Sequence, residues 1–209
     1  MPALAYRFLT PLYDPLIRVT TRERTFKEAL IEQARIGEGM DVLDVGSGTG
    51  TLALWIKQRY PSASVHGLDG DPDVLRRARS KAKSRRVEVS FTAGLSYELP
   101  YPDASFDRVV SSLFFHHLLT VDKERTLAEI RRVLRPDGEL HIADWGRPED
   151  PVMRLAARGI RLLDGAEPTA DNLSGRLPAL IAAAGFGRVT EGRGFRTPYG
   201  LLRLLSATA

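Results

Sequence analysis

The stretch Val42-Leu43-Asp44-Val45-Gly46-Ser47-Gly48-Thr49-Gly50 decides the fold of this chain. Its first half is mostly apolar, which is typical of a buried strand. Its second half has glycine at every second position, and glycine adopts positive φ easily and lets a ligand approach the backbone without a Cβ atom in the way. The segment 51–60 reads as a helix, whose N-terminal N–H groups and positive dipole end point toward the same loop. The sequence therefore predicts a strand, a cofactor-binding loop and a helix in succession.

Two kinds of cofactor suit such a loop. The dinucleotide fingerprint is G-x-G-x-x-G/A with an acid about 20 residues further on. Residues 48–53 match it loosely, and Asp69 lies at a suitable distance. Counted from Gly46, however, the third glycine position is occupied by Thr51. Asp44 would repel a pyrophosphate, whereas it can accept a hydrogen bond from an ammonium group, directly or through water. The pattern therefore favours a nucleoside that carries positive charge.

Five segments, in order along the chain, resemble the class I S-adenosylmethionine (SAM)-dependent methyltransferases. They read DVGSGTG at 44–50, VHGLD at 65–69, LPYPDASFD at 99–107, SSLFFHHL at 111–118 and EIRRVLRPDGEL at 129–140. The resemblance covers roughly residues 38–146 well and the flanks in outline. Within the family the core is most similar to the quinone-biosynthesis C-methyltransferases and their small-molecule relatives. The resemblance implies SAM as cofactor, S-adenosylhomocysteine as product, and a small molecule such as a quinone precursor, lipid headgroup or secondary metabolite as methyl acceptor.

Strand-like and helix-like segments alternate along the chain, which predicts an α/β fold with helices on both faces of a doubly wound, mostly parallel sheet. The resemblance implies a Rossmann-like sheet of seven strands that ends in an antiparallel C-terminal hairpin. Residues 1–209 are expected to form one methyltransferase domain, with a helical N-terminal lid (1–37), a cofactor-binding core (38–146), and an acceptor-site helix with C-terminal strands (147–209). The expected strands cover 41–45, 64–68, 87–91, 107–111, 139–143, 187–191 and 201–207, and the expected helices cover 11–35, 51–60, 72–84, 122–134, 152–163 and 174–184.

Ligands in such sheets bind beyond the carboxyl ends of the strands, so the cofactor site should gather the residues that follow them. The resemblance assigns the two ribose hydroxyls to Asp69, and Asp71 is better placed to cap the helix that begins near Pro72. Ser112 is equally well explained as a residue at the edge of the core. The expected cofactor-binding residues are Asp44, Gly46, Ser47, Gly48, Thr49, Gly50, Asp69, Gly70, Gly94, Leu95, Ser96 and Ser112.

One position departs from the family pattern. Relatives commonly place Asp or Asn in the loop before Leu99-Pro100, where it accepts a hydrogen bond from the adenine amino group, and this chain has Leu95 there. An unpaired buried amine would cost about 1–3 kcal/mol. Adenine recognition is therefore expected to rely on the backbone, on apolar packing, and on water or Ser96. The departure keeps open an alternative function as a catalytically degenerate SAM-binding or interaction protein.

Methyl transfer from a sulfonium depends mainly on position and orientation. A base is required only when the acceptor has to lose a proton. His116 and His117 follow the fourth strand and are candidates for that base or for positioning the acceptor. The alternative is that one of them caps the next helix or packs against the neighbouring phenylalanines. The expected substrate pocket comprises Tyr6 and Tyr13 of the lid and Asp144 and Trp145 after the fifth strand.

The chain has no cysteine. This excludes a disulfide framework, Cys-ligated zinc and iron–sulfur clusters, and it excludes pyrimidine C5-methylation through a covalent cysteine adduct. No Asn-Pro-Pro-Tyr or Asp-Pro-Pro-Tyr segment, the pattern of enzymes that methylate base amino groups, is present. We expect no metal ion and no nucleic-acid partner. An RNA methyltransferase, suggested by the sequence pI of 9.6, is the weaker alternative because the net charge is only +4.

No run of 18 apolar residues and no signal-peptide pattern is present, so the sequence predicts a cytoplasmic protein without a membrane-spanning segment. One stretch, 152–163, is amphipathic and carries Arg154, Arg158 and Arg161 on one face. A basic amphipathic helix can contact an anionic membrane surface. The simpler explanation is a solvated face over an apolar core. Peripheral membrane contact therefore remains open at this point, and the oligomeric state has no sequence signal.

Overall fold

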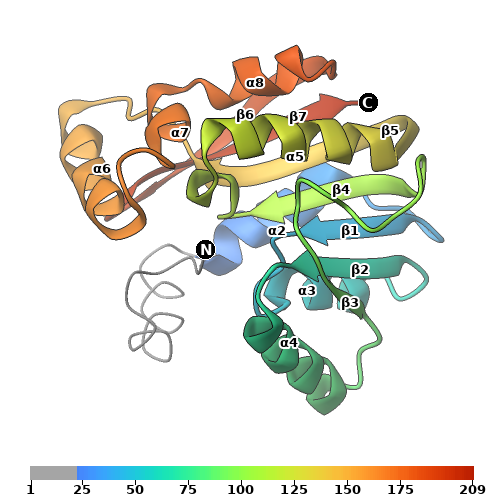
Figure 1. Cartoon of the computed structure of the whole chain (residues 1–209). Coiled ribbons are helices and arrows are strands. Elements are labelled where there is room, and N and C mark those ends of the chain that lie inside the picture. Colours follow the sequence, from blue (N-terminus) through green and yellow to red (C-terminus); the bar gives the residue numbers. More distant parts are fainter. Residues whose placement is uncertain (1–22) are drawn as a thin grey trace.

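The computed structural model of the chain describes residues 23–209 (Figure 1). The part of the expected lid (1–37) that precedes Glu23 lies outside the described residues, and so does the corresponding part of the expected 11–35 helix. In chain order the elements are α2 (Glu23–Ala34), β1 (Asp41–Val45), α3 (Thr51–Arg59), β2 (Ser64–Asp69), α4 (Pro72–Arg85), β3 (Ser90–Ala93), β4 (Phe106–Ser112), the 3₁₀ turn η1 (Phe115–His117), α5 (Thr120–Val133), β5 (Leu134–Trp145), α6 (Pro151–Asp164), α7 (Ala170–Ser174), α8 (Leu177–Ala183), β6 (Gly187–Thr197) and β7 (Gly200–Thr208).

The strands form one seven-stranded sheet in the order β3-β2-β1-β4-β5-β7-β6. β1 pairs in parallel with β2 and with β4, and β4 pairs in parallel with β5. The C-terminal part differs, because β7 runs antiparallel to both β5 and β6. The predicted fold class is therefore confirmed. The strand order reverses between β1 and β4, and ligands of open α/β sheets bind at the carboxyl ends of the strands that flank such a reversal.

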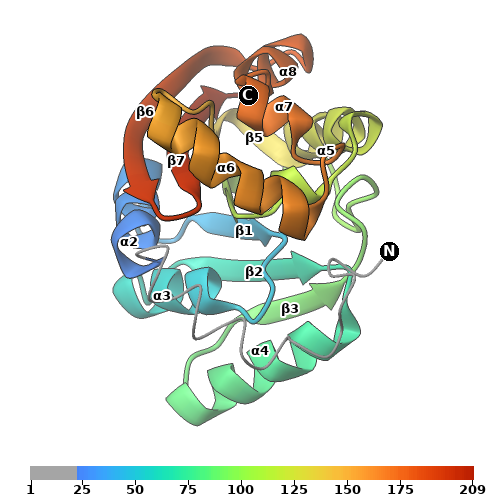
Figure 2. The ribbon, with the colours of Figure 1, turned by 90° about the vertical axis from the view of Figure 1, so that its left-hand side faces the viewer.

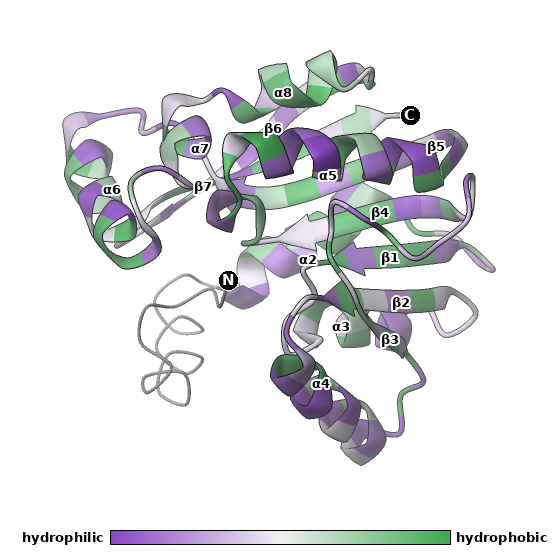
Figure 3. Ribbon diagram, viewed as in Figure 1, coloured by the Kyte–Doolittle hydropathy of each residue, from purple (hydrophilic) through white to green (hydrophobic). Residues whose placement is uncertain are grey.

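Helices cover both faces of the sheet (Figures 1 and 2). α2 and α3 contribute to one buried apolar cluster, and α5 and α8 contribute to the other. Strand β1 has buried side chains on both faces: Val42 belongs to the first cluster and Leu43 to the second. This is why its apolar residues Val42, Leu43 and Val45 do not follow a strict alternation. Figure 3 shows the same division, with hydrophobic colours in the central strands and hydrophilic colours on the outer side of α4 and α5.

The predicted start of the third strand was wrong. β3 begins at Ser90 rather than at Val87, because the preceding helix uses Val87 to close its C-terminus. Arg86 adopts a left-handed conformation with φ 54°, and the N–H of Val87 donates to the carbonyl of Ala82 at 3.0 Å. A helix end of this kind satisfies carbonyls that would otherwise lack partners. Pairing with β2 then starts at Ser90.

The predicted helix over 174–184 corresponds to α8, but its predicted start was wrong, because α8 begins at Leu177 and Ser174 is the last residue of the separate helix α7. Gly175, with φ +79°, ends α7, and Pro178 lies in the first turn of α8. A left-handed glycine and an early proline are the usual signs of one helix ending and another beginning. β6 extends past the expected end at 191 to Thr197, with irregular pairing to β7 between Glu191 and Gly194.

Candidate active site

The glycine loop after β1 is held in place by the end of β2. The N–H groups of Gly46 and Ser47 both donate to the carbonyl of Leu68 at 2.9 Å. Gly46 has φ +71°, and a Cβ atom there would lie 2.3 Å from the Phe114 ring. Gly48 has φ +53°, but a Cβ atom there would meet nothing within 4 Å. Packing inside the protein therefore demands glycine at position 46, whereas the open side of Gly48 is available to a ligand.

Asp69, at the end of β2, is fixed by backbone donors. Its Oδ2 accepts a hydrogen bond from the N–H of Gly48 at 2.8 Å, and its Oδ1 accepts one from the N–H of Asp71 at 2.9 Å. Burial raises the pKa of this carboxyl above its usual value. Each oxygen keeps a free lone pair, since an ionised carboxylate has about four acceptor sites. Asp71 caps α4, as predicted, through a 2.8 Å bond from the N–H of Asp73.

Asp44 is the most unusual group in the loop region. Its side chain is buried, with 1% of the residue exposed, and neither carboxylate oxygen has a hydrogen-bond partner with normal geometry among the described residues. Burial raises its pKa from 3.8 to about 7, although the charge of Lys27 and the backbone N–H of Ala53, which is too poorly placed for a regular hydrogen bond, act in the opposite direction. A buried carboxylate without a partner is costly, and such a group calls for a cation or a proton in its vicinity. The hydroxyl of Ser47 is likewise buried without a partner in this part of the chain.

Thr49 connects the loop to α4. Its Oγ1 accepts a hydrogen bond from the ammonium of Lys81 at 2.9 Å, and the same ammonium donates to Thr51 Oγ1 at 3.1 Å. The hydroxyl of Thr49 is thus turned toward α4, although the sequence placed it among the cofactor-binding residues. The cofactor-binding role predicted for Thr49 would therefore require its backbone rather than its hydroxyl.

Gly70, Gly94 and Leu95 lie next to one another at the ends of β2 and β3. A Cβ atom at Gly70 would lie 3.7 Å from the carbonyl oxygen of Gly94 and 3.8 Å from Leu95 Cδ2. Leu95 is 46% exposed and offers an apolar surface there. Ser96 is buried instead, and its Oγ lies 2.8 Å from Thr126 Oγ1. The hydroxyl that could have replaced the missing Asp or Asn is therefore engaged inside the protein.

His116 and Asp144 form a buried pair beyond β4 and β5. His116 Nδ1 lies 2.6 Å from Asp144 Oδ1, and both side chains are almost fully buried. Asp144 also accepts backbone N–H bonds from Phe114, Phe115 and Trp145 at 2.7–3.1 Å. Burial works to raise the pKa of Asp144, but the charge and hydrogen bonds supplied mainly by His116 lower it overall. Asp144 thus orients the imidazole of His116 through Nδ1 and makes no contact with its Nε2.

A second carboxylate, Asp164 at the end of α6, approaches the same histidines. Its Oδ2 lies 3.6 Å from His116 Nε2, and its Oδ1 lies 4.0 Å from His117 Nδ1. The two imidazole rings are 3.9 Å apart between centroids. Burial raises the pKa of Asp164, and burial together with the neighbouring His116 lowers the pKa of His117 to about 3. His117 is therefore a neutral imidazole at physiological pH.

Comparison with known proteins decides the family. The family described as "Methyltransferase domain" matches residues 42–138. The demethylmenaquinone methyltransferase of Thermus thermophilus is 34% identical over 152 residues, which are 72% of this chain and 68% of that protein. The chain belongs to the SAM-dependent methyltransferases. Enzymes of this family take a methyl group from SAM and release S-adenosylhomocysteine.

Two further proteins place this methyltransferase among its relatives. The demethylmenaquinone methyltransferase of Deinococcus radiodurans is 37% identical over 142 residues, which are 67% of this chain and 58% of that protein. The methyltransferase therefore spans between 58% and 68% of the length of these two relatives. A SAM-dependent methyltransferase structure from Aquifex aeolicus has a TM-score of 0.67 at 22% identity, over 87% of this chain and 88% of that one, and shows that the fold is shared.

The residues of this methyltransferase fit SAM. Asp44 supplies a buried carboxylate that lacks a partner among the described residues and matches the ammonium of the amino acid part. The backbone at Gly48 is open to a ligand, and Asp69 beside it has acceptors for the ribose hydroxyls. Leu95 offers an exposed apolar surface but no acceptor for the adenine amine. The chemistry of these groups therefore suits the ammonium and the ribose of SAM, and the side chain at position 95 offers only an apolar contact.

Several residues that were predicted to line the substrate pocket or the cofactor site do not have the surroundings expected there. Trp145 is 5% exposed and packs in the apolar cluster with α2 and α3, and Asp144 is buried beneath His116 rather than exposed in a pocket. Ser112 is half-buried and pairs with Ala143 in the sheet. Tyr6 and Tyr13 lie outside the described residues.

Asp164 was missed by the sequence analysis. A sequence signal did exist, because an acidic residue in the last turn of a helix faces the negative end of the helix dipole. Asp164 ends α6, and Gly165 follows it. An acidic residue at a position where it destabilises its own helix is a reason to look for a functional role of that residue.

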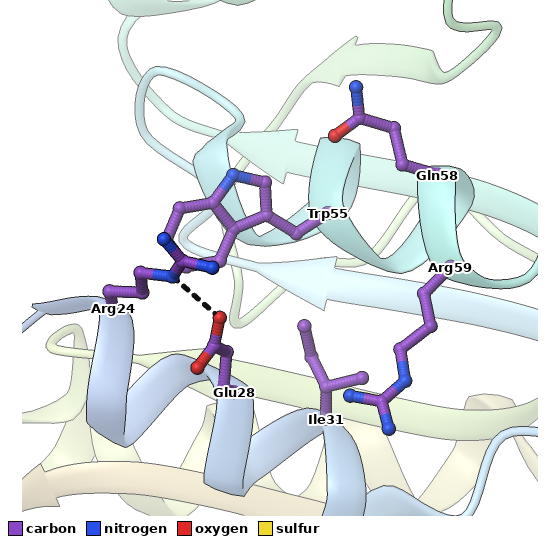
Figure 4. A pocket seen from close by; sticks show the side chains of 6 residues that line it. All are labelled: Arg24, Glu28, Ile31, Trp55, Gln58 and Arg59. Atoms are coloured by element: carbon purple, nitrogen blue, oxygen red, sulfur yellow. Dashed lines mark hydrogen bonds and ion pairs between the residues drawn. The ribbon is translucent and has the colours of Figure 1, made fainter.

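A pocket of about 350 Å³ lies elsewhere on the methyltransferase, between α2 and α3 (Figure 4). Figure 4 shows Arg24 bonded to Glu28 on α2 opposite the indole of Trp55 on α3. None of the predicted site residues lines this pocket. Among residues 23–209, no helix is long and apolar enough to cross a membrane.

Proposed function

We propose that this chain transfers a methyl group from SAM to a small-molecule acceptor at the carboxyl ends of β1, β2 and β4. The observation that carries the proposal is Asp44, a buried carboxylate without a partner among the described residues, next to a glycine loop with an open backbone face. When bound, SAM supplies a methyl group on a sulfonium whose positive charge disappears during transfer. A site that fixes the donor and excludes water favours such a reaction.

Each cofactor-binding residue has a distinct task in this proposal. Asp44 neutralises the ammonium of the amino acid part, which in turn restores the ordinary acidity of Asp44. Asp69 accepts hydrogen bonds from the ribose hydroxyls while Gly48 and Asp71 hold its carboxylate in place. The adenine packs against Leu95. The substitution of an apolar residue for an acceptor at this position lowers the affinity for the adenine without changing the identity of the cofactor.

We infer that the acceptor binds on the side of His116 and His117. Asp144 fixes the orientation of His116 through the 2.6 Å contact at Nδ1, so Nε2 can take a proton from an acceptor or hold one of its oxygens. A quinone precursor is the acceptor class that the relatives suggest, since two of them are demethylmenaquinone methyltransferases by name. A degenerate binding protein and an RNA methyltransferase are not favoured by these relatives.

Peripheral membrane contact through α6 is part of this proposal. The helix exposes Val152, Leu155, Leu162 and Leu163, which are between 52% and 86% exposed. The exposed Arg154, Arg158 and Arg161 form a second stripe on the same helix. An apolar stripe beside arginines suits the surface of an anionic bilayer. Cosedimentation with anionic but not with neutral vesicles, reduced in a Leu155→Gln and Leu162→Gln double variant, is the expected result, and equal binding of wild type and variant would contradict it.

The first experiment measures binding of SAM and S-adenosylhomocysteine to the purified chain by calorimetry. We expect binding by the wild-type chain and its loss in Asp69→Ala. Asp73→Ala is the matched control, because Asp73 lies close by in α4 but is exposed and pairs with Arg76. Unchanged binding in Asp69→Ala would contradict the ribose assignment, and absence of binding to the wild type would contradict the proposed activity. Transfer of a labelled methyl group to a panel of quinols then tests the acceptor class.

A further inference from the structure

The histidine and aspartate side chains beyond β4 share a feature that the methyl-transfer proposal does not require. One ligand-type atom from each of His116, His117 and Asp164 can be chosen so that all three lie within 4.8 Å of one another. The residues come from two separate segments, the η1 turn and the C-terminal end of α6. α6 lies beyond the carboxyl ends of the central strands, on the side where the ligand site is expected (Figure 1).

The distances between these groups are too long for direct hydrogen bonds and suit a shared ion. His116 Nε2 and Asp164 Oδ2 are 3.6 Å apart, and His117 Nδ1 and Asp164 Oδ1 are 4.0 Å apart. Zinc binds nitrogen and carboxylate oxygen at about 2.0–2.2 Å, so two atoms on one ion lie at most about 4.4 Å apart. Both measured separations, which join the two histidines to different oxygens of Asp164, are within that limit, and a set of one atom from each residue lies within 4.8 Å, so that a small side-chain movement would bring all three onto one ion. Asp164 Oδ1 is buried and has no hydrogen-bond partner among the described residues.

Asp144 contacts the other ring nitrogen of His116, the one that does not face Asp164. A histidine that binds a metal through one ring nitrogen usually donates the N–H of its other nitrogen to a carboxylate. His116 shows this geometry, because Nδ1 is held by Asp144 at 2.6 Å and Nε2 faces Asp164. Within residues 23–209, neither Asp144 nor Asp164 has an ion pair with Lys or Arg within 4.0 Å, and both pair only with the histidines. Two buried carboxylates therefore lie near one point, and their direct ion pairs among these residues are with the histidines alone.

We propose that His116, His117 and Asp164 bind a divalent first-row transition metal ion, with Asp144 orienting His116. Two imidazole nitrogens and one carboxylate oxygen suit zinc and its neighbours rather than magnesium or calcium. Three protein ligands leave at least one coordination position open, as in catalytic rather than structural zinc sites. This differs from the sequence analysis, which expected no metal ion and did not include Asp164 among the site residues.

The open position gives the ion a role at the acceptor, and this part of the inference rests on the proposed function. A hydroxyl of the acceptor that binds the ion loses its proton to solvent more readily, because a bound divalent cation lowers the pKa of an oxygen ligand. The resulting oxyanion makes the acceptor a better nucleophile for the methyl group. A nitrogen that binds the ion cannot also take up a proton. The metal role and the general-base role of His116 Nε2 are therefore alternatives that experiment can separate.

The test uses the full-length chain, stripped with a chelator, and titrates it with Co²⁺ while the visible absorption of the ion is recorded. We expect one bound ion per chain, displaced by Zn²⁺. Asp164→Asn and His117→Ala should each weaken binding by at least tenfold. Asp144→Asn should weaken it by about 10–100-fold, as loss of an orienting carboxylate does. His66→Gln is the control, because His66 bonds with Ser64 at the other end of β2.

The outcome of the Co²⁺ titration can be separated from the methyl-transfer proposal, since SAM binding is measured separately on the same preparations. Retained SAM binding in each variant shows that the fold is intact and that only the metal site has changed. Absence of Co²⁺ and Zn²⁺ binding by the wild-type chain would overturn the metal site and leave His116 as the candidate base. Binding that persists unchanged in both Asp164→Asn and His117→Ala would overturn the assignment of ligands.

Discussion

The two halves of the candidate site are held together in different ways. In the cofactor half, the glycine loop and Asp69 are fixed by backbone hydrogen bonds between neighbouring strands, such as those from Gly46 and Ser47 to Leu68. In the acceptor half, side chains from η1, β5 and α6 meet, and their order depends on the contacts of Asp144 and Asp164 with the histidines. Backbone contacts tolerate side-chain substitutions, whereas a side-chain cluster does not. Substitutions should therefore affect the two halves differently.

Asp144→Ala is expected to have the largest effect on stability. It removes the acceptor for His116 and for the backbone N–H groups of Phe114, Phe115 and Trp145. Breaking a buried, hydrogen-bonded charge pair costs about 3–5 kcal/mol. The free energy of unfolding in urea measures the loss. Asp103→Ala is the control, because Asp103 is 78% exposed in its pair with Arg132 and should change stability by less than about 1 kcal/mol. Equal effects of both substitutions would contradict the orienting role of Asp144.

Asp44 should make the stability of the cofactor half depend on pH. Its folded pKa of about 7 lies above the usual 3.8, so between these values the folded state binds more protons than the unfolded state and stability falls as pH rises. The difference corresponds to roughly 4 kcal/mol when fully developed above pH 7. Asp44→Asn should lack this decrease. The measurement is the difference in unfolding free energy between variant and wild type from pH 4 to pH 8. A constant difference would show that Asp44 has a partner in solution, and saturating SAM should also flatten the wild-type curve.

The contrast between the halves also explains what the sequence could predict. The glycine loop, Asp69 and Asp71 were predictable because strand, loop and helix follow one another within a short segment, and their backbone geometry is encoded by glycine and by helix-capping preferences. The pairing of Asp144 with His116 and the approach of Asp164 depend on where α6 lies over the sheet, which no local pattern specifies. The break at Gly175 was missed because the apolar periodicity continues across it. The internal hydrogen bond of the Ser96 hydroxyl could not be foreseen, since its partner, Thr126, comes from α5.

Gly46→Ala tests whether the loop depends on packing as well as on backbone conformation. Positive φ costs a non-glycine residue about 1–2 kcal/mol, and the overlap with the Phe114 ring adds about 1–3 kcal/mol. We expect a loss of roughly 3 kcal/mol in unfolding free energy. Gly39→Ala is a matched control, because Gly39 has the same φ of +71° but no atom within 4 Å of a new Cβ. If the unfolding free energy fell by the same amount in both variants, the overlap with the Phe114 ring would make no contribution to the loss of stability.

Gly48→Ala should separate ligand binding from stability. Its φ is +53°, and a Cβ atom there would meet nothing within 4 Å. The variant should therefore lose only about 1–2 kcal/mol of stability, as Gly39→Ala does. Its affinity for SAM should fall at least tenfold, since the new methyl group would occupy the open side of the loop, and calorimetry measures that change. Unaltered affinity would place the ligand on another face of the loop.

Leu95→Asp should have the smallest effect, and in the opposite direction. Leu95 is 46% exposed beside Gly70, so a carboxylate at this position can reach solvent and costs little stability. It would accept a hydrogen bond from the adenine amino group, which the present chain leaves without a side-chain acceptor. A hydrogen bond of this kind contributes about 1 kcal/mol, or roughly a fivefold increase in SAM affinity. Leu162→Asp, at an 86% exposed position on α6, controls for the added charge. If Leu95→Asp bound SAM no more tightly than this control, the adenine would have to lie elsewhere, and the cofactor half would be defined by Asp44, Gly48 and Asp69 alone.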